Sequence, residues 1–237
     1  MPVGLDPLRS PVGLATAACV LFGSVAVADL LAVAADINTR QVYGAGTADD
    51  FLRFDEAAAD HADTLYQAAA SLQLYTLLAA AVVFLLWFRR VRLNAEVFDA
   101  RAHSMRPGWA IGAWFIPFGN FWLPHRVAGG IWTASSPAGR GMPVPRGLLH
   151  LWWAALICAE LFSRYAGRLY DNAGGADEFM DAVDLVLASD AFGIVAAVLS
   201  ILFVRRLTAM QGERAALGTN PVATTLPAQR AEWRRAH

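Results

Sequence analysis

The chain has 237 residues, of which 57% are hydrophobic and 16% are charged. A typical soluble domain has roughly 45–50% apolar and about 25% charged residues. The composition therefore argues against a disordered chain and against an ordinary soluble enzyme. The formal net charge is −1, so no overall field would attract a nucleic acid. We expect a protein that is partly surrounded by lipid.

Four segments are apolar and long enough to cross a bilayer as helices, which takes about 20 residues each. These predicted spans are residues 12–35, 65–88, 147–167 and 185–204. The sequence thus predicts an all-α integral membrane protein with four transmembrane helices. Its membrane domain is residues 12–207, preceded by a short N-terminus (1–11) and followed by a mobile tail (208–237).

A fifth apolar stretch lies within residues 107–135 and differs from the four spans. Pro117 and Pro124 each remove a helical hydrogen bond, and the free backbone groups would need partners in lipid. Its tryptophans are typical of the headgroup level. We expect a broken, re-entrant or interfacial aromatic hairpin here, and a fifth complete span is the alternative.

The distribution of charge predicts how the spans are oriented. Arginines cluster at 89–92 and 205–206, whereas acidic residues dominate residues 36–63 and 171–184. Because an excess of arginine marks the cytoplasmic side, four spans place both termini in the cytoplasm. All 19 basic residues are arginine, which we interpret as the mark of a GC-rich bacterial genome, so the predicted location is the bacterial inner membrane. A signal peptide cleaved after Ala28 is the alternative for the first span.

Acidic residues occur inside three of the predicted spans, namely Asp29, Glu160 and Asp190. Ionisable groups at such depth usually face the interior of a helical bundle. One hypothesis is a cluster that binds a cation or a proton. The other, which we favour on sequence, is structural pairing: Glu160 has Arg164 four residues later on the same helix face, and Asp190 pairs with Arg164 from a neighbouring helix.

The broken segment carries Asn120, His125 and Arg126. Broken membrane segments form binding sites in transporters, which makes these residues ligand candidates. The structural alternative is that Asn120 donates hydrogen bonds to carbonyls freed by the prolines. In that case Arg126 extends to the lipid headgroups.

Signals of catalysis are weak. Cys19 and Cys158 lie in separate apolar segments, which are typical surroundings of inert thiols. The five histidines form no metal-binding or zinc-protease spacing. We therefore expect no enzyme activity, no cofactor and no metal site.

One long motif carries a family resemblance. It consists of FRRVRLNA at residues 88–95, Pro107-Gly108-Trp109, and WFIPFGNFWLP at residues 114–124, whose central residues are Trp114, Phe115, Pro117, Asn120 and Pro124. The sequence resembles the bacterial membrane family called domain of unknown function 4328 over about residues 65–207. The resemblance implies a multi-pass inner-membrane protein and implies no catalytic residues.

Two classes of function follow from these observations. The first is a membrane interaction or scaffold protein, whose partners are the lipid bilayer and a second protein or another copy of the chain. The alternative is a binding protein or permease for a small solute or ion, with its site at the broken hairpin or at the buried acids. Nucleic acid is not an expected partner.

Overall fold

The computed structural model describes residues 8–46, 55–137 and 144–217, and the described residues are helices and their connections without any strand. The chain divides into two units. The helix unit comprises residues 14–84 and 146–204, and the loop unit comprises residues 1–13, 85–145 and 205–237.

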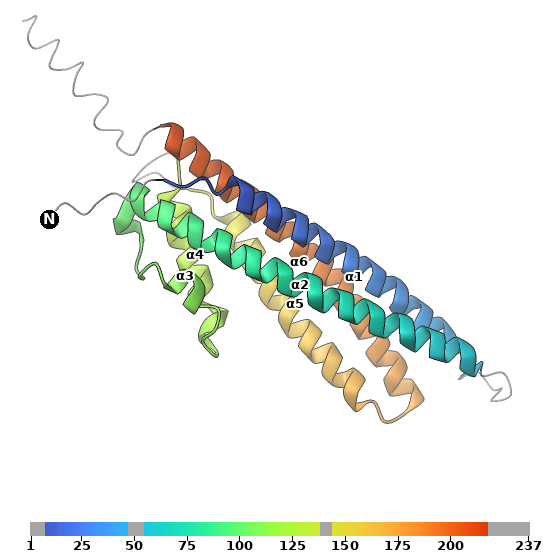
Figure 1. Cartoon of the computed structure of the whole chain (residues 1–237). Coiled ribbons are helices and arrows are strands. Elements are labelled where there is room, and N and C mark those ends of the chain that lie inside the picture. The colour runs from blue at the N-terminus through green and yellow to red at the C-terminus, as the bar shows by residue number, and fades with distance from the viewer. Residues whose placement is uncertain (1–7, 47–54, 138–143, 218–237) are drawn as a thin grey trace, which may run out of the picture. The chain divides into compact units, whose positions relative to one another are not determined.

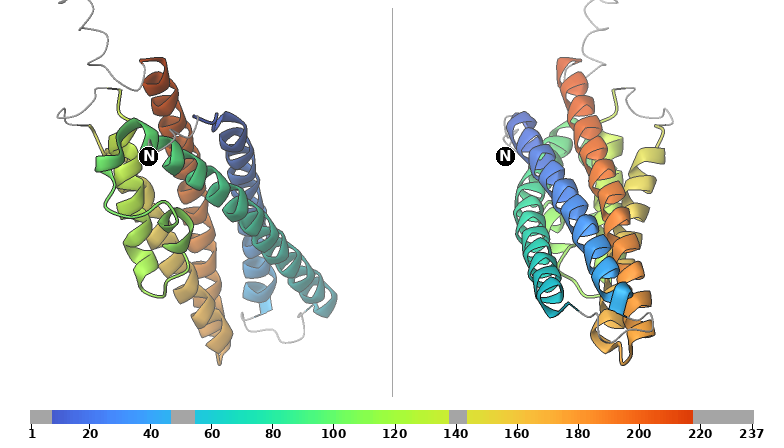
Figure 2. Two further views of the ribbon diagram at one scale, coloured as in Figure 1. Left: turned by 60° about the vertical axis from the view of Figure 1, so that its left-hand side comes forward. Right: turned by 90° about the vertical axis from the view of Figure 1, so that its right-hand side faces the viewer.

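The helix unit is built from four long helices: α1 (Val12–Gly46), α2 (Glu56–Asp99), α5 (Gly147–Asn172) and α6 (Ala176–Ala216). The last part of α2 and the last part of α6 belong to the loop unit. Within the helix unit the four helices lie side by side (Figures 1 and 2). Three residues separate α5 from α6, so these two helices run in opposite directions.

Small residues bring these helices close together. Val25 of α1, Ala80 of α2 and Ala197 of α6 form one buried cluster, and small side chains allow helix backbones to approach closely in membranes. Further along, Trp152 of α5 stacks on Phe203 of α6 with ring centroids 3.9 Å apart. The Trp152 indole also donates a hydrogen bond to the Ser200 hydroxyl at 3.2 Å.

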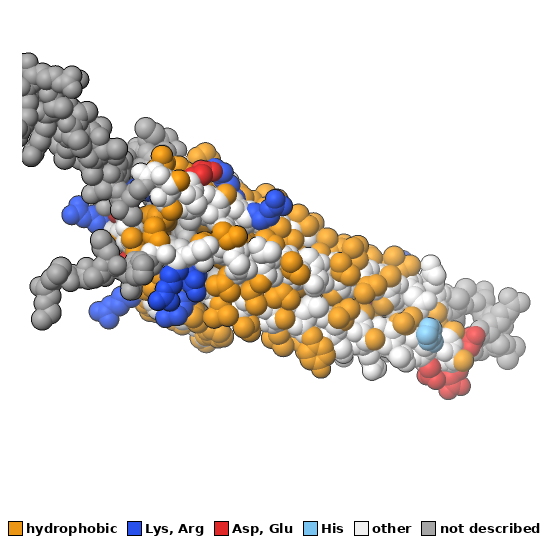
Figure 3. Space-filling view, turned by 45° about the horizontal axis from the view of Figure 1, so that its top comes forward, with side chains coloured by type: hydrophobic (Ala, Val, Ile, Leu, Met, Phe, Trp, Pro, Cys, Tyr) orange, Lys and Arg blue, Asp and Glu red, His pale blue; other side chains and the backbone are white. Residues whose placement is uncertain are grey.

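The outer surfaces of these helices are apolar. Large hydrophobic side chains such as Leu30, Leu78, Val82 and Val198 are 46–59% exposed, and hydrophobic side chains extend along the helices on the face seen in Figure 3. Within the described residues, three helical segments are long and apolar enough to cross a membrane: Val12–Gly44, Glu56–Ala102 and Ala176–Ala216. Long helices that are apolar on their outer faces suit a lipid environment.

The prediction of four helices that are apolar enough to cross a membrane needs a correction, because α5 is not among the helices of the described residues that reach this length and apolarity. It forms the predicted helix, but Glu160, Arg164 and Arg168 interrupt its apolar run. Each predicted span lies within a longer helix. The predicted start of the mobile tail at residue 208 is also too early. Residues 208–216 continue α6, and Met210 and Gln211 are buried there. The remainder of the predicted tail (218–237) and residues 1–7 lie outside the described residues.

The loop unit contains the predicted broken segment. After α2 come the short helices η2 (Ala100–Ala102), α3 (Trp109–Gly112) and η3 (Gly119–Phe121), and then α4 (Leu123–Ala134). Pro124 stands in the first turn of α4, where a proline costs no helical hydrogen bond. The segment is therefore broken as the prolines predict.

Candidate functional site

Two carboxylates of α1 lie inside the helix unit. Asp29 and Asp36 are seven residues apart, which places them on one face of a helix, and they are only 7% and 1% exposed. The sequence analysis assigned Asp36 to an outer loop, but α1 continues to Gly46. Asp36 is therefore a helical residue directed into the bundle.

The acids inside the helix unit lie close together across α1, α2 and α6. The Gln73 amide of α2 donates a hydrogen bond to Asp29 Oδ1 at 3.0 Å, and Asp190 of α6 lies near Gln73. Asp190 also lies near Asp36, since both line the same cavity. One carboxylate oxygen of Asp36, Oδ2, is buried and has no hydrogen-bond partner.

Two cavities adjoin these groups. The larger cavity, about 270 Å³, is lined by Asp29, Gln73, Glu160 and Asp190 among other residues. The smaller cavity, about 150 Å³, is lined by Asp36 and Tyr66 and again by Gln73 and Asp190. The three acids singled out from the sequence thus line one cavity, as the cluster hypothesis of the sequence analysis requires.

Pairing is confirmed for one acid and is wrong for another. Arg164 and Glu160 of α5 form an ion pair at 2.5 Å, with side chains that are 66% and 52% exposed. Asp190 does not pair with Arg164, whose ion pair goes to Glu160 instead, and Asp190 lies near Gln73 and Asp36 in the cavity lining. No arginine is among the described residues that line the two cavities.

An aromatic cluster and an ion pair lie near the ends of the same helices. Tyr66 of α2 stacks on Tyr170 of α5 with centroids 5.2 Å apart, and Phe179 of α6 contacts both Tyr170 and Tyr43 of α1. Arg40 of α1 forms an ion pair with Asp184 of α6. These contacts hold the ends of the helices together. They lie beside the smaller cavity, because Tyr66 is one of its lining residues.

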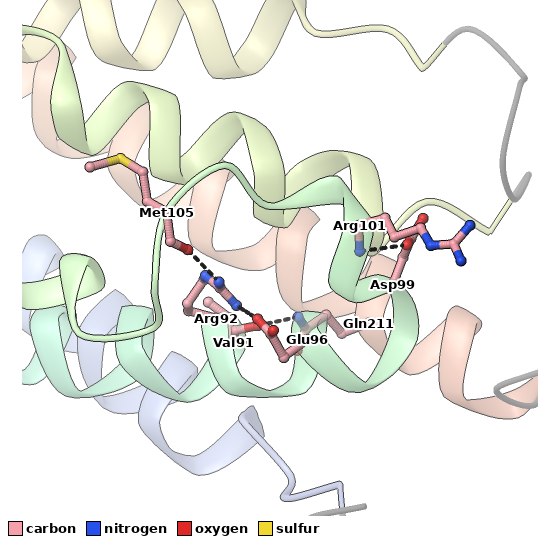
Figure 4. A network of polar contacts seen from close by, with 7 residues as sticks. All are labelled: Val91, Arg92, Glu96, Asp99, Arg101, Met105 and Gln211. Carbon is pink, nitrogen blue, oxygen red and sulfur yellow. Dashed lines mark hydrogen bonds and ion pairs between the residues drawn. The ribbon is translucent and has the colours of Figure 1, made fainter. Parts of the chain in front are cut away.

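In the loop unit, the arginine-rich part of the family motif holds a connection in place. The buried guanidinium of Arg92 forms an ion pair with Glu96 and donates to the Met105 carbonyl at 2.8 Å (Figure 4). Asp99 accepts a bond from the Arg101 backbone N–H at 3.0 Å and so caps η2. Arg92 therefore stabilises the turn that follows α2.

The Asn94 side chain is a second anchor of the same motif. It accepts a bond from the Arg9 N–H at 3.2 Å and donates to the Arg9 carbonyl at 2.9 Å and to Gln211 Oε1 at 3.1 Å. The Gln211 amide donates to the Val91 carbonyl and the Ser135 hydroxyl. One buried network thus joins α2, α6, the turn after α4 and the segment before α1.

The aromatic hairpin divides into buried and exposed residues. Trp114 packs on Phe88 of α2 with centroids 6.1 Å apart, and Pro124 is buried. Phe115, Phe118 and Trp122 are 70%, 78% and 57% exposed, and Pro117 is exposed as well.

The expected role of Asn120 is not found. Its Oδ1 atom is buried without a hydrogen-bond partner, and among the described residues its side chain donates to no carbonyl freed by a proline. The bonds around it run through the backbone instead, since the Asn120 N–H donates to the Ile116 carbonyl at 3.0 Å. Arg126 is exposed and donates to the Ser104 hydroxyl at 3.1 Å, and the neighbouring His125 is half-buried.

Little in the described residues suggests metal or thiol chemistry. No group of three or more His, Cys, Asp and Glu side chains there is placed to hold a metal ion. Neither Cys19 of α1 nor Cys158 of α5 takes part in a disulfide. The acids that line the two cavities, together with Gln73, form the candidate site of the described structure.

Sequence reasoning missed four residues of these networks, namely Asp36, Gln73, Asn94 and Gln211. A weak signal was available for Asp36, because it follows Asp29 at a helical spacing of seven. None was available for Gln73 or Gln211, because a single amide in an apolar helix gives no indication of its partner.

Comparison with known proteins agrees with the motif. No curated protein and no solved structure shows significant similarity to the chain. A family model does match, over more than half of the chain, from residue 52 to residue 209. The chain therefore belongs to the family described as domain of unknown function (DUF4328).

Proposed function

We propose that the protein is an integral membrane protein that binds a small organic cation in the larger cavity of the helix unit. The observation that carries the proposal is the gathering of Asp29, Glu160 and Asp190 around one cavity of about 270 Å³. Acidic groups inside membrane helices usually mark ion or substrate paths. This gathering favours the binding hypothesis over the scaffold hypothesis.

The chemistry of the lining selects the class of ligand. An ammonium group has three donors and no acceptor, and the cavity offers it carboxylates together with Ser163 and Ser189. Phe22 and Leu77 supply apolar wall for an alkyl group. Ligand pockets usually measure about 300–1,000 Å³, so this cavity suits a small ammonium ion. The proposal is for a binding protein and includes no catalytic step.

The proposed membrane topology follows the arginine clusters. We place both termini in the cytoplasm of a bacterial inner membrane, because Arg89 and Arg205 are exposed directly after the apolar runs of α2 and α6 and arginine marks that side. An even number of crossings is then needed, so α5 would cross together with α1, α2 and α6. Its 26 residues give a length of about 39 Å, which is enough to cross.

Reporter fusions test this topology. Alkaline phosphatase fused at Ala57 or Gly174 should be active, and fusions at Pro137 or Leu217 should be inactive. Activity at Leu217 with inactivity at Gly174 would show that α5 does not cross. Activity at Pro137 would instead show that the aromatic hairpin spans the membrane completely.

The second candidate is an interaction protein that acts through the aromatic hairpin. The observation that favours it is the exposure of Phe115, Phe118 and Trp122 on one short segment. Aromatic side chains of this kind suit the membrane interface or the surface of a second protein. Another copy of the chain is one such partner.

Thermal unfolding of the purified protein in lipid nanodiscs tests cation binding, with ethylammonium as the probe. A ligand at a hundredfold excess over its Kd stabilises the folded state by about 2.7 kcal/mol. We expect a rise in Tm for the wild type and none for Asp29→Asn. The control is Asp181→Asn, an exposed acid on α6, which should respond like the wild type. A wild type that responds to ethylammonium no more than to sodium would contradict the proposal.

A further inference from the structure

The two cavities of the helix unit share part of their lining. Gln73, Ser163, Ser189 and Asp190 line both. Asp190 therefore lies between the cavity that contains Asp29 and Glu160 and the cavity that contains Asp36. A change of charge in one cavity therefore acts electrostatically, over a short distance, on the acids that line the other cavity.

The closeness of Asp36 and Asp190 favours a proton between them. Both carboxyl groups line the same small cavity, and two like charges that share a site away from water disfavour ionisation of both groups at once. One proton held between the two carboxyl groups removes this repulsion. Asp36 is 1% exposed, and its Oδ2 atom is buried without a partner. The unpartnered oxygen belongs to a residue that lines the smaller cavity.

The groups around this pair leave its charge uncompensated. Asp29 lies on the same helix as Asp36, Tyr66 approaches from α2, and Glu160 and Tyr170 approach from α5. All of these groups are acidic or neutral, and no basic residue is among the described lining residues. A second negative charge in this pair would therefore need a counter-ion, which is either a proton or a bound cation.

We infer that binding of an ammonium ion in the larger cavity is coupled to release of the proton that Asp36 and Asp190 share. The inference rests on the proposed function of that cavity. In the exchange, the ammonium ion enters with one positive charge and the O–H bond of the carboxyl pair breaks. One proton then leaves to solvent, and the total charge of the site is unchanged. No bond of the ligand forms or breaks.

Gln73 connects the two ends of the exchange. Its amide donates a hydrogen bond to Asp29, and Gln73 lines both cavities together with Asp190. Gln73 therefore lies between the cation-binding carboxylate and the proton-sharing carboxylate. When the cation binds beside Asp29, its positive charge also lies near Asp190. This charge stabilises the ionised carboxylate of Asp190, so the shared proton can leave. Gln73 is therefore a positioning residue in this proposal.

The release is measured with a pH indicator dye in weakly buffered nanodisc samples, using ethylammonium as the probe. For the wild type we expect about one proton per ammonium ion bound, as for a ligand that replaces a proton. Asp36→Asn cannot hold the shared proton, so it should still gain Tm on adding ethylammonium but release no proton. Asp181→Asn should release protons like the wild type.

The possible outcomes separate this inference from the proposed function. Binding without proton release in the wild type would overturn the coupling alone, as would undiminished release from Asp36→Asn. Absence of binding in the wild type would overturn both.

Infrared spectroscopy of the ligand-free protein gives a check that does not depend on Asp36→Asn folding normally. The wild type should show the C=O stretch of a protonated carboxyl group, and ethylammonium should remove this band. Asp190→Asn should lack the wild-type band. A wild type without the band would contradict the shared proton.

Discussion

Gly193 of α6 faces the Asp29 carboxylate of α1 so closely that a Cβ atom on the glycine would lie 2.9 Å from Asp29 Oδ2. That distance is shorter than a normal contact, so only a glycine leaves Asp29 in its present position. The other oxygen of the same carboxylate, Oδ1, accepts a hydrogen bond from the Gln73 amide at 3.0 Å. The backbone of one helix thus leaves room for an acid of another.

Gly193→Ala should therefore destabilise the protein. The Asp29 carboxylate would have to turn away from Gln73, at a cost of about 1.5–3 kcal/mol for a bond to a charged group. The better helix propensity of alanine returns about 1 kcal/mol. We expect a net loss of about 1 kcal/mol, measured by thermal unfolding in nanodiscs. Gly23→Ala, where the new Cβ meets nothing within 4 Å, is the control and should be neutral or stabilising; equal effects would refute the close contact.

The network around Asn94 should be sensitive to substitution. Asn94→Leu keeps the approximate volume but removes the partners of Arg9 and of Gln211 Oε1. Because this leaves polar groups buried without partners, we expect a loss of about 1–3 kcal/mol. The segment before α1 should also become easier to cleave, which limited proteolysis would detect. Unchanged proteolysis there would show that Asn94 does not hold the segment.

Asn120→Leu should behave in the opposite way. Asn120 Oδ1 is buried without a partner, and this arrangement costs about 1–3 kcal/mol in the folded state. Replacing it by leucine removes that cost, so Tm should stay unchanged or rise. A clear fall in Tm would mean that the amide makes bonds that stabilise the hairpin, as the sequence analysis expected.

His103 should make stability depend on pH. Burial, together with the nearby charge of Arg92, lowers the pKa of His103 below its ordinary value of 6.5. The unfolded chain then binds the proton more tightly, so the contribution of His103 to stability is complete above about pH 6.5 and decreases as the pH falls through the folded-state pKa. His103→Gln should lose less Tm than the wild type between about pH 7.5 and 5. Parallel pH curves for the two proteins would contradict this.

Two adjacent glycines of α4 offer a matched comparison. A Cβ on Gly130 would lie 2.9 Å from His103 Nδ1 and 3.1 Å from the Ala102 carbonyl oxygen, whereas a Cβ on Gly129 meets nothing within 4 Å. Because a backbone carbonyl has little freedom to move, Gly130→Ala should cost about 1–3 kcal/mol, as overpacking does. Gly129→Ala should be neutral or stabilising. Similar Tm values for both variants would show that the turn after α2 shifts easily.

The helices could be predicted from sequence, because long apolar runs and prolines act locally. Residues 12–35 and 65–88 lie inside α1 and α2, and Pro117 and Pro124 mark the break before α4. The ion pair between Glu160 and Arg164 was also predictable, because both residues lie on one helix at a fixed spacing. What failed was the extent of the helices: α1 continues through Asp36, because Asp36 and Thr39 are buried inside the bundle and Arg40 forms an ion pair with Asp184 of α6.

The sequence by itself determined that the chain is helical and apolar, where its broken segment lies, and which family it belongs to, because composition, hydrophobic runs and motifs are properties of neighbouring residues. Only the tertiary structure decided that Asp29, Asp36 and Asp190 line adjoining cavities together with Gln73, and that Asn94 rather than Asn120 is the hydrogen-bonded amide of the motif. Those partners are separated by tens of residues. Their meeting depends on how each helix is rotated and shifted against the next, and packing sets that geometry rather than local sequence.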